Sequence, residues 1–125
     1  MQAQRLGVAF AHTVCLAGAF MVPDPIFNEL PATQVNDGAP RSPFTLLHGA
    51  ADRVIPLSVA NDFAAALRQH DWPVQVVELP ADHGSIAGAV YDASAGRYRA
   101  AVDAETLAVA ADVAARIADA GRPVW

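Results

Sequence analysis

The chain has 125 residues, of which 54% are hydrophobic, and a formal net charge of −5. This length allows one modest domain, 1–125, and the composition argues against wholesale disorder. The acidic balance, with eight basic residues that are all scattered arginines, gives no support to nucleic-acid binding. The single cysteine, Cys15, excludes an internal disulfide and a cysteine-rich metal site, and its apolar neighbours predict a buried thiol.

The apolar segment 6–22 has two interpretations. It is typical of a buried strand over 13–21 in the middle of a sheet, where both faces of a parallel strand are apolar. It also resembles an export signal over 1–20, with the basic Arg5, an apolar stretch and small residues after it. We favour the strand and a cytoplasmic location, and we expect no membrane span because the segment is short and His12 interrupts it.

Two short apolar runs on either side of a helix-length segment predict a strand, a helix and a second strand. A loop with five prolines, 23–43, leads into the first of these strands at 44–48. A helix over 58–70 follows, with Ser58 as its cap, and the second strand occupies 74–79. A crossover of this length implies right-handed, parallel pairing of the two strands.

Beyond residue 85 the hydrophobic pattern predicts secondary structure less clearly, except for a helix near the C-terminus. Residues 86–91 are compatible with a short helix or a strand, and a turn is predicted at 92–96. A helix over 103–120 begins at the capping residue Asp103. Its apolar stripe consists of Leu107, Ala110, Val113, Ala114 and Ile117. The predicted fold class is therefore α/β, with about three parallel strands, helices on both sides in three layers, and a core spanning 10–121.

Asp52 and His83 each follow the carboxyl end of a predicted strand. Loops at this end of a parallel sheet share one edge, and neighbouring strands begin their loops about 5 Å apart. The carboxylate can then accept a hydrogen bond from one imidazole nitrogen while the other nitrogen handles the proton of a nucleophile. Gly49 and Gly84 beside them allow sharp turns. From the residues alone, an Asp bonded to its own backbone and an exposed loop His explain the pattern equally well.

A family resemblance favours the catalytic interpretation. The segment LLHGAADRVIPLSVANDFAAAL, followed by VELPADHGS and a terminal helix, resembles the C-terminal part of an α/β-hydrolase of the esterase, dienelactone-hydrolase or prolyl-oligopeptidase-like branches. In that family a strand ending in HG precedes an acid in a D-x-V-x-P segment. The likeness is close over 44–85 and looser over 10–22 and 103–120. It implies that Asp52 and His83 are the acid and base of a Ser-His-Asp hydrolase of ester or amide bonds.

The chain departs from the family pattern at the nucleophile. The family places its serine in G-x-S-x-G upstream of the acid, and that motif and the oxyanion loop are absent here. None of the four serines has the right context: Ser42, Ser58, Ser85 and Ser94. We therefore expect either a hydrolase that is inactive as the isolated chain, or a non-catalytic, truncated or partner-dependent half-domain. An exposed sheet edge would let such a half-domain self-associate or bind a partner chain.

The remaining polar residues carry weaker signals. His48 is predicted to be structural, and Asp82, although adjacent to His83, is not expected to tune it. The four histidines match no zinc motif and no glycine-rich phosphate loop is present, so we predict no metal and no cofactor. The expected partner is a small-molecule ester or peptide substrate, without nucleic acid or membrane.

Overall fold

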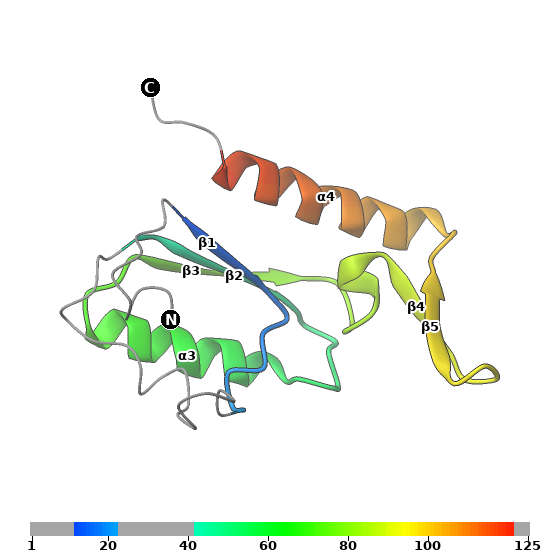
Figure 1. The fold of residues 1–125 in the computed structure, drawn as a ribbon, viewed down its shortest axis with the longest axis horizontal. Helices are drawn as coiled ribbons and strands as arrows, with labels where there is room; N and C mark the ends of the chain where they lie inside the picture. Colours follow the sequence, from blue (N-terminus) through cyan, green and yellow to red (C-terminus); the bar gives the residue numbers. More distant parts are fainter. Residues whose placement is uncertain (1–11, 23–41, 122–125) are drawn as a thin grey trace.

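A computed structural model describes residues 12–22 and 42–121 (Figure 1). Most of the predicted proline-rich loop and the basic start of the alternative export signal lie outside the described residues. In chain order, the elements are β1 Thr13–Leu16, β2 Phe44–Gly49, α3 Leu57–Gln69, β3 Val74–Leu79, the 3-10 helix η1 Ser85–Ala87, β4 Ala89–Asp92, β5 Arg97–Ala100 and α4 Ala104–Ala120.

The main sheet has the order β1-β2-β3, and both pairings are parallel. Helix α3 covers one face of this sheet and α4 lies over the other (Figure 1). The α/β fold class with three layers and three parallel strands is thus confirmed. In the described segments, no helix combines the length and the apolar character needed to cross a bilayer.

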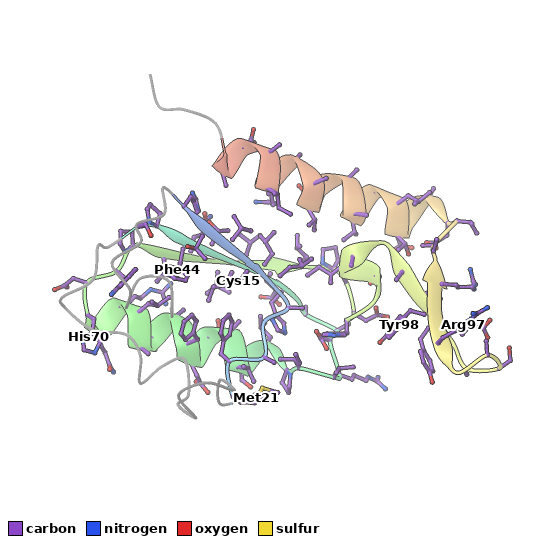
Figure 2. The ribbon with its side chains drawn as sticks, in the orientation of Figure 1. Cys15, Met21, Phe44, His70, Arg97 and Tyr98 are labelled. Atoms are coloured by element: carbon purple, nitrogen blue, oxygen red, sulfur yellow. The ribbon has the colours of Figure 1, made fainter. Side chains whose placement is uncertain are left out.

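Residues of the sheet alternate between two cores, one on each face. The core under α3 includes Phe44 and Leu46 of β2 and also Phe63 and Leu67 of the helix, and Figure 2 labels Phe44 on this side. Leu47 instead belongs to the second core, under α4. Because successive side chains of a strand point to opposite faces, β2 supplies both cores and is buried on both sides.

Strand β1 is shorter and less central than predicted. It covers four residues and lies at one edge of the described sheet, where its side chains are only partly covered. Ala17 donates the last ladder bond to Leu47 and then takes a left-handed backbone conformation with φ 50°, which ends the strand. The chain turns back so that Phe20 stacks on Phe63, with ring centroids 4.1 Å apart. The predicted strand therefore begins at Thr13 as expected, but its predicted end at residue 21 and its place in the middle of the sheet are wrong, because it ends at Leu16 and lies at an edge of the described sheet.

The two long helices form within one residue of their predicted ends. The Asp103 carboxylate accepts the N–H of Thr106 at 2.9 Å and caps α4 as predicted. Ser58 does not cap α3, because this helix begins at Leu57, after Pro56, and no side chain bonds to its first turn. The assignment of Ser58 as a cap is wrong.

Only part of the predicted stripe on α4 is buried. Val113 is enclosed in the second core, whereas Leu107 and Ile117 remain about half exposed. The helix contacts η1 and β1, so its apolar face extends beyond the surface that the described sheet offers.

A β-hairpin, β4–β5, lies between η1 and α4. The strands pair antiparallel, and the predicted turn at 92–96 connects them. The Asp92 carboxylate accepts the N–H groups of Ser94 and Ala95 and holds this turn. The sequence of residues 86–91 was compatible with a short helix or a strand. In the structure, this segment contains the end of the 3-10 helix η1 and most of β4. The second strand of the hairpin was not predicted.

Candidate active site

The loop after β2 wraps around the Asp52 carboxylate. Oδ1 of Asp52 accepts the backbone N–H groups of Val54 at 2.9 Å and Ile55 at 2.8 Å. His48, buried at the end of β2, donates from Nε2 to the Ile55 carbonyl oxygen at 2.6 Å, because a carbonyl only accepts. Its distance of 3.6 Å to Oδ2 of Asp52 is too long for a hydrogen bond. His48 therefore has the structural position predicted for it, and it holds the loop that surrounds the acid.

The loop after β3 is held by reciprocal bonds between Asp82 and Ser85. The Asp82 carboxylate accepts the N–H of Gly84 at 3.0 Å and of Ser85 at 2.8 Å, and Oγ of Ser85 accepts the N–H of Asp82 at 2.8 Å. The Ser85 N–H bond is the main cause that holds the pKa of Asp82 below its ordinary value. Asp82 thus stabilises the turn that carries His83. The spacing D-x-x-S at residues 82–85 is the sequence feature from which these reciprocal bonds could have been predicted.

The two loops are joined through their backbones. The N–H of Ala50 donates to Leu79 and the N–H of Ala51 donates to Ala81, at 2.9 and 3.0 Å. Gly49 makes this approach possible, since a Cβ atom there would lie 2.2 Å from the carbonyl oxygen of Ala81. Neither Gly49 nor Gly84 has a positive φ, so close packing, and not the sharp turn predicted, explains these glycines.

This junction brings the two predicted side chains together. Nδ1 of His83 lies 2.8 Å from Oδ2 of Asp52, which confirms the predicted proximity. A carboxylate only accepts, so Nδ1 carries the proton and Nε2, at the opposite edge of the ring, is left as the acceptor. The Asp52 side chain is completely enclosed, whereas that of His83 is 31% exposed. The acid is therefore shielded from water while the imidazole remains accessible.

The electrostatics of Asp52 favour its ionised form. Burial raises the pKa of this carboxyl group, but hydrogen bonds from the Ile55 N–H, the His83 imidazole and the Val54 N–H together outweigh it. The pKa of Asp52 consequently lies below its ordinary value. A carboxylate that stays ionised can keep the His83 tautomer fixed and stabilise an imidazolium.

Replacing Gly49 by alanine is expected to lower the free energy of unfolding by roughly 1–3 kcal/mol, because the added methyl group must push backbone atoms of the second loop away. Chemical denaturation would measure this loss. Gly121→Ala is the matched control, since a Cβ atom there would have its nearest neighbour at 3.6 Å. Equal stability of the two variants would contradict the close packing inferred at Gly49.

The four serines have other positions or partners. Oγ of Ser85 bonds to the Asp82 N–H, and Oγ of Ser94 donates to Asp92 at 2.6 Å in the hairpin turn. Ser58 lies in the first turn of α3, and Ser42 precedes β2, at the opposite end of that strand from Asp52. The site therefore contains an acid and a base, and the structure places no serine of the chain beside His83 as a nucleophile.

A pocket of about 720 Å³ opens beside the imidazole. Its lining combines residues of both loops with the aromatic pair of the hairpin, including Ala51, Arg53, Val54, His83, Tyr91 and Tyr98. This volume is in the range of small-molecule sites. The two tyrosines were missed in the sequence, because their approach depends on the hairpin. Over 12–22 and 42–121, no three His, Cys, Asp or Glu side chains gather closely enough to hold a metal ion.

Comparison with known proteins identifies the fold. No protein-family model and no curated protein matches the chain. Among solved structures, it is similar to a protein from Klebsiella pneumoniae subsp. pneumoniae titled "Putative Dienelactone Hydrolase", with a TM-score of 0.54 and 23% identity over 86% of this chain and 40% of that one. The chain has part of the α/β-hydrolase fold. It spans less than half of the similar protein, which is consistent with the C-terminal part of an α/β-hydrolase predicted from the sequence.

Proposed function

We propose that this chain supplies the acid and the base of a serine hydrolase that acts on ester or amide bonds. The observation that carries the proposal is the 2.8 Å contact between the accessible imidazole of His83 and the enclosed carboxylate of Asp52. The α/β-hydrolase fold supports it, because it is the fold of a hydrolase family. In that fold, acid and histidine follow one another in the chain in the order seen here.

In the proposed mechanism, Nε2 of His83 takes the proton of a serine hydroxyl as the oxygen attacks the carbonyl carbon of the substrate. Asp52 stabilises the resulting imidazolium through Nδ1. The imidazolium then gives its proton to the leaving alcohol or amine, which leaves an acyl-enzyme. In the second half, His83 takes a proton from water, the hydroxide displaces the serine, and the proton returns to the serine oxygen.

The serine in this proposal comes from a segment of the same gene product outside these 125 residues. The described sheet offers a place for such a segment, because β1 forms an edge and Leu16 on it is partly exposed. We therefore expect the isolated chain to be inactive, since two members of a triad without the third give only weak catalysis.

The absence of a serine from the triad position also supports a second candidate, a non-catalytic half-domain. This half-domain would associate through the β1 edge with itself or with a partner chain and would hydrolyse nothing.

Hydrolysis of 4-nitrophenyl acetate separates the two candidates. The isolated chain is expected to show no turnover above buffer, and turnover is expected once the chain is produced with the segment encoded upstream, provided that this segment contains G-x-S-x-G after a strand. Light scattering on the same samples reports the association state. An upstream segment without such a serine, together with inactivity of the longer product, would contradict the hydrolase proposal. A monomeric isolated chain that turns over the ester would contradict the half-domain and the external serine.

A further inference from the structure

The hairpin β4–β5 presents two tyrosines side by side at the pocket. Tyr91 and Tyr98 are directly paired across the two strands, with ring centroids 5.2 Å apart and planes at 65°. Both rings remain about half exposed although they are large and apolar. In Figure 2, the labelled Tyr98 lies on the hairpin at the end of the molecule opposite His70. An exposed aromatic pair of this kind often marks a binding surface.

The backbone fixes this pair next to His83. The N–H of Ala89 donates to Gly84 and the N–H of Ala101 donates to Gly88, so both ends of the hairpin are tied to the turn that follows His83. The Tyr98 ring lies directly against Gly84, where an added Cβ atom would be only 2.6 Å from it. Because Gly84 is the neighbour of His83 in the chain, a group that contacts this ring lies close to the imidazole.

The polar groups of the pocket leave the aromatic surface as its main recognition feature. Oδ1 of the Asp82 carboxylate already accepts two backbone N–H groups of its own turn. Val54 is 60% exposed and adds apolar surface on the side of the acid loop. Arg53 is the one cationic residue of the lining. A planar ring that packs against the tyrosines gains contact area and favourable edge-to-face geometry.

We propose that this pocket binds esters that carry an aromatic ring next to the scissile bond, with Tyr91 and Tyr98 as the residues that determine this preference. The inference rests on the proposed hydrolase function, since it names the substrate class of the same site. Its test uses binding alone, so it does not depend on the missing serine and its outcome is separate from that of the hydrolysis assay.

The probes are methyl benzoate and methyl cyclohexanecarboxylate, two neutral esters of similar size that differ in the planarity of the ring. Titrations of the isolated chain followed by amide NMR are expected to show shifts at Gly84 and the hairpin, with methyl benzoate bound roughly threefold to tenfold more tightly. Tyr91→Leu and Tyr98→Leu should each reduce this preference, whereas Val102→Ala, an exposed position after the hairpin, should leave it unchanged.

Equal affinity for the two esters would overturn the proposal, as would a preference that survives in both tyrosine variants. Arg53→Gln tests the charged alternative, because a loss of binding in this variant alone would show that the pocket recognises charge. Amide spectra of each leucine variant report whether the main sheet and α3 remain folded. If either leucine variant disturbs them, the ring signals of Tyr91 and Tyr98 in the unchanged chain decide: methyl benzoate should shift these signals, and unshifted ring signals would overturn the proposal. Tyr98→Phe and Tyr91→Phe are controls that keep the rings and are expected to keep the preference.

Discussion

Replacing Asp52 by alanine is expected to lower the free energy of unfolding by roughly 2–5 kcal/mol, because the change leaves buried and partly buried donors without an acceptor. The carboxylate accepts the N–H groups of Val54 and Ile55 and the Nδ1–H of His83, and its side chain has no access to water. Chemical denaturation at neutral pH measures the loss. Asp62→Ala, at an exposed position on α3, is the matched control and should change stability by less than about 0.5 kcal/mol.

Because of the same carboxylate, the free energy of unfolding of the chain is expected to fall at acidic pH. The pKa of Asp52 is lower in the folded chain than in the unfolded one, so the unfolded state binds a proton first as the pH falls. The stabilisation is therefore complete above the ordinary carboxyl pKa and is lost as the pH falls towards the lowered pKa of the folded state. Asp52→Asn should remove this part of the acid dependence. Identical acid profiles of Asp52→Asn and the unchanged chain would contradict the assignment.

Much of the fold follows from local sequence signals. The apolar runs at Phe44–Gly49 and Val74–Leu79 have the length of buried strands, and the segment between them has helical spacing, so their parallel pairing could be predicted. Asp103 and the apolar stripe at helical spacing after it marked α4 equally well. These signals depend on contacts within one element or between neighbours in the chain.

The predictions are wrong where packing between distant parts of the chain determines the local structure. The segment after Leu16 is apolar enough to continue a strand, but the stacking of Phe20 on Phe63 accompanies a turn that sequence periodicity does not reveal. Ser58 is a good capping residue, yet the helix begins one residue earlier. The apolar stripe of α4 predicted more burial than the described sheet provides, as the exposed Leu107 and Ile117 show.

For the site, the sequence predicted the pair but not its support. Asp52 and His83 were expected at one edge because both follow parallel strands, and their contact is observed. The bond of His48 to Ile55 and the packing of Gly49 on Ala81 involve backbone atoms, which have no residue-specific signal. The catalytic role of the pair stays a prediction, and it requires a test in a form of the protein that contains the serine.

In such a form, His83→Ala is expected to reduce kcat for 4-nitrophenyl acetate by roughly four orders of magnitude, because the proposed mechanism assigns the serine proton to Nε2 of His83. Asp52→Asn should cause a loss of similar size, since an amide in this place neither stabilises the imidazolium nor favours a proton on Nδ1. Steady-state kinetics would measure both effects. KM should change much less than kcat, because the pair acts on proton transfer and leaves the apolar lining intact.

His70→Ala provides the control for His83→Ala. His70 lies at the C-terminal end of α3, at the opposite end of the molecule from the labelled Tyr98 (Figure 2), so its loss should leave kcat within about twofold of the unchanged protein. Amide spectra would show whether the His83 variant keeps its sheet, which distinguishes lost chemistry from lost folding. A folded His83→Ala protein that retains more than about a tenth of the original kcat would remove His83 from the mechanism, because a general base contributes at least roughly a hundredfold.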